Sequence, residues 1–270
     1  MAGVTSVRLR LGALLWLLTL QFFVVEAVAA ARYDGYSRTD LTISLLGAST
    51  SPAQVAMNVS FVAQGLLIAG GLLLLRPALS GRGTSVVTAM LSAAALGVIV
   101  VGTVPLGDGE TWHELGAFLY LVGGGLGLIG LAYAVRHRSE ALGTILVLLG
   151  LVATAMTVFY LAAVTGYLGE GGTERAAAYP LPVGLALAAV GLVLLARRPA
   201  PADGEPDRRA RKEQERAERA RMAEERDAAL EAAAARAEGR GGRDPEPARD
   251  ADDDFDPDDP WATPRRRDDT

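Results

Sequence analysis

Residues 85–105, SVVTAMLSAAALGVIVVGTVP, form an apolar run of 21 residues without a charged side chain. A helix rises about 1.5 Å per residue and the hydrocarbon core of a bilayer is about 30 Å thick, so about 20 apolar residues cross it. Taken alone, the run also suits a buried helix of a large soluble protein. The rest of the chain decides between these two interpretations.

Further runs of similar length occupy about residues 11–31, 54–75, 112–135, 141–164 and 179–196. Short polar links separate them, and six such helices would make an implausible core for a soluble protein of this length. The sequence therefore predicts an all-α fold, a polytopic membrane bundle of six transmembrane helices within residues 1–198.

Charges are distributed unevenly between the two parts of the chain. Residues 1–198 carry 11 of the 26 basic and 9 of the 31 acidic residues, and the remainder carry the rest. Residues 199–238 are predicted to be a Pro-rich hinge and a solvated charged helix, because Ala, Glu and Arg favour helices. Residues 239–270 are predicted to be a disordered acidic tail. Its acidic excess argues against a nucleic-acid partner.

The tail also carries two aromatic residues within its acidic run. Phe255 and Trp261 suggest a short motif for a cytoplasmic protein partner. A purely solubilising acidic tail is the alternative.

The arginines of residues 1–198 predict the orientation in the membrane. Three fall on one side, Arg32, Arg38 and Arg175; the other side has Arg8, Arg10, Arg76, Arg82, Arg136, Arg138, Arg197 and Arg198. This bias predicts a cell-membrane protein with both termini cytoplasmic and with loops 32–53, 106–111 and 165–178 outside. Cleavage of the first run as a signal peptide near Ala29 is an alternative, although that run is long for one.

Cofactor and metal chemistry finds little support in the sequence. There is no cysteine, which excludes disulfides and thiolate ligands. The two histidines, His113 and His137, are predicted on opposite membrane faces, so they cannot share a metal or a haem. The GLGLIG motif at residues 125–130 lies inside a predicted membrane helix, where glycines serve helix packing rather than dinucleotide binding. We expect no cofactor and no metal.

Candidate functional residues gather on the predicted outer side. Glu26 lies within the first span, where a charge is costly and its plausible partners are Arg32, Arg38 and His113. In TVPLGDGETWHELGAF, residues 103–118, most polar groups suit a turn and a helix cap. His113 is the exception, and Asp108, Asp40 and Ser44 are further polar candidates near it.

Three motifs give the first part of the chain a family resemblance. TISLLGASTSPAQVAMN precedes the second span, GTVP ends the third and HELGAFLY starts the fourth. Their order resembles the uncharacterised family called domain of unknown function 998, six-helix membrane proteins of bacteria and archaea. The matching positions are Ser44, Leu46, Gly47, Pro52, Asn58, Gly102, Pro105, His113 and Gly116. Leu45 departs from the pattern, because the family often has an acidic residue there. The resemblance covers about residues 11–197 and implies the topology, not an activity.

Three classes of function remain open. The favoured one is a structural, sensing or scaffold protein whose tail binds a cytoplasmic partner. The second is a membrane enzyme that uses His113, with an outer carboxylate, on a lipid or envelope substrate. The third is a small transporter, although Gln64, Asn58 and glycines are nearly the only polar or helix-breaking residues in the spans.

Overall fold

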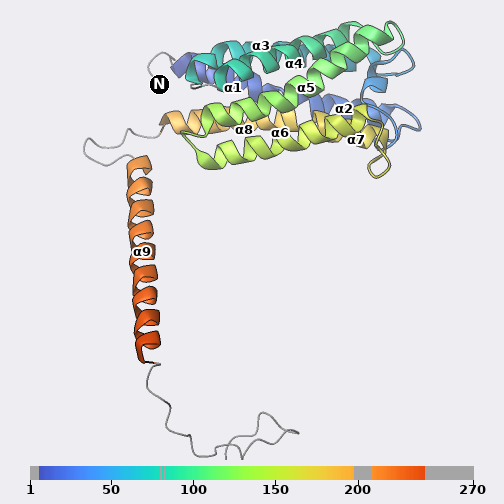
Figure 1. Cartoon of the computed structure of the whole chain (residues 1–270). Helices are drawn as coiled ribbons and strands as arrows, with labels where there is room; N and C mark the ends of the chain where they lie inside the picture. The colour runs from blue at the N-terminus through green and yellow to red at the C-terminus, as the bar shows by residue number, and fades with distance from the viewer. Residues whose placement is uncertain (1–5, 80, 82, 198–207, 241–270) are drawn as a thin grey trace, which may run out of the picture. The chain divides into compact units, whose positions relative to one another are not determined.

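Helices account for nearly all regular structure in the computed structural model, which describes residues 6–79, 81, 83–197 and 208–240. Figure 1 labels α1 (Ser6–Leu18), α2 (Gln21–Arg32), α3 (Gln54–Leu75), α4 (Gly83–Thr103), α5 (Glu110–Val135), α6 (Glu140–Leu161), α7 (Gly169–Ala178), α8 (Pro180–Arg197) and α9 (Arg208–Arg240). Two short 3₁₀ helices complete the order, η1 (Ser44–Gly47) after α2 and η2 (Arg76–Ala78) after α3.

Six helical segments of the described residues are long and apolar enough to cross a membrane. They are Ser6–Arg32, Gln54–Ala78, Gly83–Thr103, Glu110–Val135, Glu140–Leu161 and Gly169–Arg197. Together with the all-helical structure of the described residues, they confirm the predicted membrane helix bundle.

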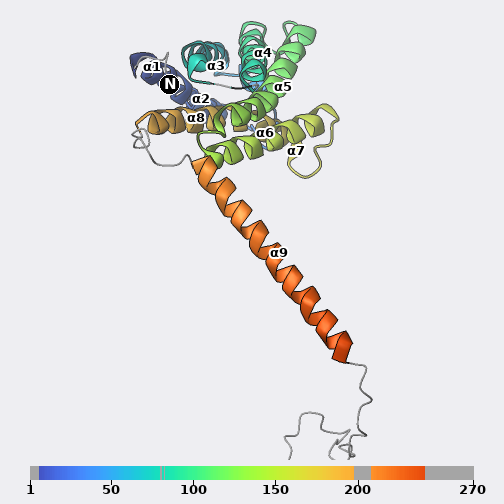
Figure 2. The same ribbon diagram turned by 60° about the vertical axis from the view of Figure 1, so that its left-hand side comes forward.

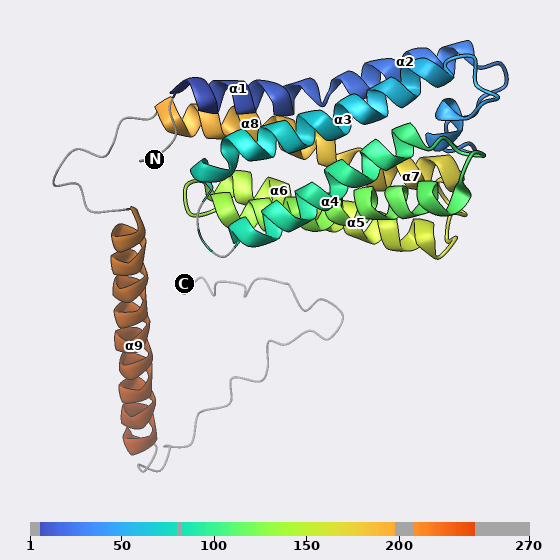
Figure 3. The same cartoon turned by 90° about the horizontal axis from the view of Figure 1, so that it is seen from above.

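Neighbouring spans in the sequence are neighbours in the bundle. The first span packs on α3, α3 on α4, α4 on α5 and α5 on α6. Figure 2 shows α3, α4 and α5 in this order. The last span then closes the ring, because α8 packs against both α6 and α1, and Figure 3 shows α8 running alongside α1.

The links between the spans give the bundle two unlike ends. The long-loop end, as we call it, carries links 33–53, 104–109 and 162–168. The arginine end carries link 136–139, with Arg76, Arg136, Arg138 and Arg197 at or near the helix ends there. α2, η1 and α7 meet at the long-loop end (Figures 1 and 3).

Glycines bring α4 and α5 into backbone contact. A Cβ atom on Gly97 of α4 would lie 2.4 Å from the Gly116 carbonyl oxygen, and one on Gly123 would lie 2.6 Å from the Met90 carbonyl oxygen. Dispersion between closely packed helices replaces the hydrophobic drive that lipid cannot supply. The glycines of the GLGLIG motif also lie inside α5, where Gly125 faces Thr154 of α6 and Gly127 faces Leu91 of α4.

The first span differs from the single straight helix expected over residues 11–31. It begins at Ser6 and is divided between α1 and α2 at Thr19 and Leu20. There the Leu20 N–H donates to the Leu17 carbonyl, a tighter 3₁₀ pattern, and the Thr19 hydroxyl donates to the Trp16 carbonyl. Such a side-chain bond to the preceding turn is a common cause of a helix bend.

The sixth span differs more, because it begins at Gly169 and not near Tyr179. Most of the link expected at residues 165–178 is the helix α7, whose sequence GEGGTERAAA contains three charged residues. α7 ends at Ala178 and α8 starts at Pro180. Proline suits the first turn of a helix, where its missing N–H leaves no intrahelical bond unmade. The physical reason for the early start is the pairing of Arg175 with Glu26 inside the bundle, which is described below.

The chain divides into two units, Met1–Pro199 and Ala200–Thr270. In the second unit α9 is a helix of 33 residues, and its side chains at 213–236 are exposed. Residues 198–207, with the predicted hinge, lie outside the described residues. So do residues 241–270 of the acidic tail predicted at 239–270, which include Phe255 and Trp261.

Candidate functional site at the long-loop end

Glu26 lies at the centre of a buried polar cluster. Its side chain is 0% exposed on α2, and its carboxylate forms two ion pairs. Arg175 Nε of α7 lies 2.9 Å from Oε1, and Arg38 Nη2 of link 33–53 lies 3.2 Å from the same oxygen. The Tyr179 hydroxyl donates to Oε2. With Tyr36, described next, these residues form what we call the Glu26 cluster: Glu26, Tyr36, Arg38, Arg175 and Tyr179.

Arg175 ties the long loop to the last span. Its Nη1 donates to the carbonyl oxygens of Arg38 at 2.6 Å and Leu41 at 3.0 Å, and its Nη2 donates to the Tyr36 hydroxyl. The Tyr36 hydroxyl in turn donates to the Thr42 carbonyl at 2.7 Å. Burial raises the pKa of Tyr36, so its hydroxyl stays protonated and able to donate at neutral pH. One guanidinium thus joins α2, the loop and α7.

Glycines on α7 allow the loop backbone to lie against this helix. A Cβ atom on Gly171 would lie 2.1 Å from the Leu41 carbonyl oxygen, and one on Gly169 would lie 2.2 Å from that of Thr39. The Gly172 N–H donates to the Thr39 carbonyl at 3.0 Å. Larger side chains at these positions would separate the loop from Arg175.

The other arginine of the cluster is accessible. The Arg38 side chain is 49% exposed, whereas the Glu26 carboxylate that it contacts is fully enclosed. Arg38 Nη2 also donates to the Tyr179 hydroxyl at 2.7 Å. Arg38 is therefore the most exposed member of the cluster, and a molecule from the aqueous side can reach it.

The sequence-based candidates divide between two places. Glu26 and its predicted partner Arg38 lie in the cluster, and Ser44 contacts it indirectly, because its hydroxyl donates to Glu174, the neighbour of Arg175, at 3.4 Å. Asp40 is exposed and accepts a hydrogen bond from the Ser37 hydroxyl. Arg32, the alternative partner of Glu26, is exposed.

His113 and Asp108 belong to the separate link between α4 and α5. His113 is 3% exposed, and its Nδ1–H donates to the Val104 carbonyl at 2.8 Å, which joins the start of α5 to the residue after α4. Asp108 is exposed, and its backbone N–H donates to the Pro105 carbonyl within a turn. Within the described residues no hydrogen bond or ion pair connects His113 with Glu26, Asp108 or Ser44.

The sequence did not indicate Tyr36, Tyr179 and Arg175 as partners of Glu26, and it placed Arg175 outside the membrane spans. Arg175 was assigned to an external link because three charges and three glycines interrupt the apolar run there. The Ala176–Ala178 run that follows and Pro180 at the start of α8 are the local signals of a helix that continues.

A second polar group lies deeper in the bundle, between α2 and α3. The Ser60 hydroxyl donates to Gln21 Oε1 at 2.9 Å, and Gln21 Nε2 lies 3.4 Å from Gln64 Oε1. On the next turns of α3 towards the arginine end, Trp16 Nε1 donates to the Ile68 carbonyl. These bonds hold the bent first span against α3, as side-chain hydrogen bonds between membrane helices do.

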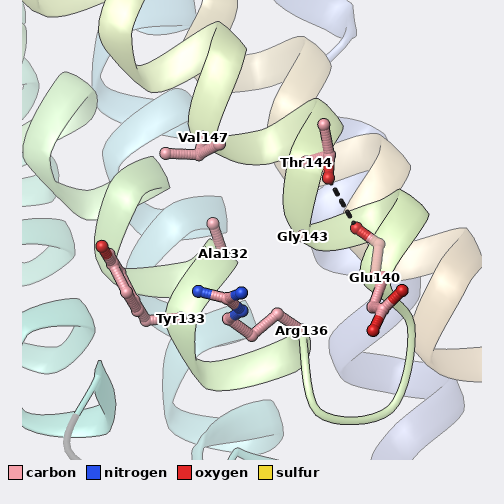
Figure 4. A pocket seen from close by; sticks show the side chains of 7 residues that line it. All are labelled: Ala132, Tyr133, Arg136, Glu140, Gly143, Thr144 and Val147. Atoms are coloured by element: carbon pink, nitrogen blue, oxygen red, sulfur yellow. Dashed lines mark hydrogen bonds between the residues drawn. The ribbon is translucent and has the colours of Figure 1, made fainter. Parts of the chain in front are cut away.

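The arginine end has a hollow between α5 and α6. It has a volume of about 320 Å³. Figure 4 shows Tyr133 and Arg136 on one helix facing Val147 and Gly143 on the other, and the Arg136 guanidinium lies 5.8 Å from the centre of the Tyr133 ring. Burial and the charge of Arg138 lower the pKa of nearby His137. Among the described residues no group of three or more His, Asp or Glu side chains has a metal-binding arrangement.

Two searches, one of curated proteins and one of solved structures, found no match to this chain. The family model described as "Protein of unknown function (DUF998)" matches residues 17–201, which include most of the first span and all of the other five. Residues that carried the resemblance hold the long-loop end together: Asn58 Nδ2 donates to the Gly47 carbonyl at 2.9 Å, and Ser44 contacts Glu174. The chain therefore belongs to the DUF998 family of proteins of unknown function.

Proposed function

We propose that this membrane protein is a sensing or scaffold protein whose long-loop end responds to an anionic ligand at Arg38. The observation that carries the proposal is the unequal exposure of one ion pair, in which Glu26 is 0% and Arg38 is 49% exposed. A ligand anion that binds Arg38 competes with Glu26 for it, and Glu26 is joined through Arg175 to the loop and to α7. Competition at the surface therefore changes contacts between the first and the last span.

The same geometry gives little support to catalysis at this site. The Glu26 carboxylate accepts bonds from Arg175, Arg38 and Tyr179, so a general base would first have to lose those partners. His113 is buried and its Nδ1 is bound to a backbone carbonyl. Glu26 and His113, the candidate acid and base, are thus bound to different partners and do not contact each other.

The second half of the proposal concerns the region after residue 198. We propose that it lies in the cytoplasm and contacts a protein partner, in agreement with the excess of arginine at the arginine end of the bundle. α9 is suited to this role, because Met222 and Leu230 are 65% and 57% exposed on a helix that is otherwise rich in charge. Phe255 and Trp261 are proposed to take part in the same contact.

Photo-crosslinking in cells tests the proposal with the full chain. A photoreactive residue replaces Leu230, and the cross-linked products are compared for the wild type, Arg38→Gln and the control Arg32→Gln. Arg32 is an exposed arginine at the same end. A sensor gives a product whose yield changes several-fold in Arg38→Gln alone, whereas a scaffold gives the same product in all three chains. Absence of any product from the wild type contradicts the partner role of α9.

A further inference from the structure

Glu174 is a buried carboxyl that forms no ion pair with any of the described residues. It is 6% exposed on α7. Successive helix residues point about 100° apart, so Arg175 faces Glu26 while Glu174 faces η1 and α5. Both arginines of the Glu26 cluster pair with Glu26, and within the described residues neither forms an ion pair with Glu174.

Two neutral groups are the hydrogen-bond partners of Glu174 in the described residues. The Ile43 backbone N–H donates to Oε2, and the Ser44 hydroxyl donates to Oε1 at 3.4 Å. Two such bonds, one of them long, leave an ionised carboxylate poorly compensated for the water that it loses on burial. A protonated carboxyl in the same place needs far less compensation.

A small cavity adjoins the carboxyl. Its volume of about 30 Å³ is enough for one water molecule, since about 10–15 Å³ of this measure accommodates one. Eight of its eleven lining residues are apolar, and Glu174, Ser44 and Tyr120 are the polar ones. Tyr120 is 7% exposed on α5, and its hydroxyl has no partner with hydrogen-bond geometry among the described residues, although the Gln64 side chain lies beside it. An orphaned buried hydroxyl beside a carboxyl indicates an additional small polar ligand between them.

We propose that Glu174 and this cavity form a proton-binding site, in which the carboxyl holds an exchangeable proton and one water bridges it to the Tyr120 hydroxyl. Proton exchange is a simple transfer: the carboxyl O–H bond breaks, and the proton passes to the water and from there to solvent. Three side-chain oxygen groups in an apolar cavity offer little to a metal cation, which would lose its hydration shell there.

Other titratable groups lie around Glu174. They are Glu26 on α2, Tyr36 and Arg38 in the loop, Tyr120 on α5, Tyr160 on α6, and Arg175 and Tyr179 on the last span. Glu26 and the two arginines neutralise one another in direct contact. Glu174 is therefore the buried carboxyl of this interface that has no counter-charge in direct contact among the described residues.

Removal of the proton acts on the loop. Glu174 joins α7 to residues 43 and 44, and an ionised Glu174 would attract water into the interface between them. The buried carboxyl keeps its proton to a higher pH than a free carboxyl does, so between these two points the folded state binds one proton more than the unfolded state. Across this range stability falls as pH rises, by about tenfold in the unfolding equilibrium constant per pH unit, and above the titration of Glu174 it levels off.

Thermal unfolding of the purified full chain between pH 5 and pH 9 tests the site, with Glu174→Gln compared with Glu170→Gln. Glu170 is an exposed carboxyl one turn earlier on α7. The wild type and Glu170→Gln are expected to lose stability with rising pH, while Glu174→Gln, which keeps the shape of the neutral acid, loses this dependence. An equal pH dependence in Glu174→Gln overturns the proposal. So does a stabilisation at high pH by sodium chloride but not by choline chloride, since it assigns the site to a metal cation.

Infrared spectroscopy supplies a reading that does not depend on the stability of a variant. The wild type at neutral pH is expected to show the carbonyl band of a protonated carboxyl in an apolar site, and the band is expected to disappear at high pH. Tyr120→Phe, which removes one donor to the bridging water, shifts that disappearance to higher pH. Absence of the band from the wild type at neutral pH overturns the proposal.

Discussion

At the scale of single residues, Arg175 determines how the long-loop end is held. A buried guanidinium is tolerated only when its N–H groups are satisfied, and this one bonds to Glu26, the Tyr36 hydroxyl and backbone carbonyls of the loop and of α7. Composition placed Glu26 in the first span and indicated Arg38 as a partner. The sequence did not indicate Arg175 as a partner of Glu26, because these two residues, 149 positions apart, become neighbours only when the bundle closes.

The ion pair between Glu26 and Arg175 predicts that the free energy of unfolding depends on both residues. Glu26→Gln leaves the buried Arg175 guanidinium unpaired and is expected to cost about 3–5 kcal/mol of unfolding free energy. Arg175→Gln is expected to cost less, because Glu26 keeps the half-exposed Arg38 as a partner. The double variant removes both charges and recovers part of this loss. Reversible unfolding in mixed micelles measures these values, and Arg32→Gln, on an exposed arginine, should stay within about 0.5 kcal/mol of the wild type. Additive losses in the double variant would contradict direct coupling of the pair.

At the scale of elements, four of the spans lie close to the apolar runs of the sequence, whereas the first and the sixth differ from them. α3, α4, α5 and α6 begin and end within about three residues of the expected bounds, because their interiors are uniformly apolar. Apolar length did not predict α7 because this helix contains polar residues, and a hydropathy average counts Glu174 and Arg175 as if they faced water. The bend at Thr19 was hidden for the opposite reason, because threonine is common in straight helices and only its bond to Trp16 reveals the turn.

The close packing of α4 on α5 predicts that a larger side chain at Gly97 lowers the stability of the protein. Gly97→Ala brings a methyl group against the Gly116 carbonyl oxygen, 2.4 Å away in the present structure, so the helices must move apart. We expect a loss of about 1–3 kcal/mol, the usual cost of overpacking, seen as a lower midpoint of thermal unfolding. Gly166→Ala is the matched control, because a Cβ atom there meets nothing within 4 Å. Equal midpoints for the two variants would contradict the close contact.

At the scale of the whole molecule, the proposed orientation rests on the charge bias, and an even number of spans would place both ends of the bundle on one side of the membrane. Residues 6–197 form the membrane bundle, and six crossings return the chain to the side on which it started. The arginine end carries most of the basic residues near helix ends, which favours a cytoplasmic position for both termini.

Cysteine labelling tests this orientation directly, because the natural chain has no cysteine. Thr50→Cys places a thiol on the exposed part of the long loop, and Glu225→Cys places one on exposed α9. A membrane-impermeant maleimide is expected to label Thr50→Cys in intact cells and Glu225→Cys only after the membrane is opened. Labelling of Glu225→Cys in intact cells would reverse the proposed orientation.

The Glu26–Arg175 pair also has a consequence for biosynthesis. Glu26 leaves the ribosome in the first membrane segment, whereas its partner is made 149 residues later, in the last one. During the synthesis of the four intervening spans the carboxylate lacks this counter-charge, and until α7 arrives the loop lacks the guanidinium that orders residues 36–42. The first segment therefore reaches its final contacts only after the last segment has inserted. A chain that stops after α6 would lack the ion pair between Glu26 and Arg175.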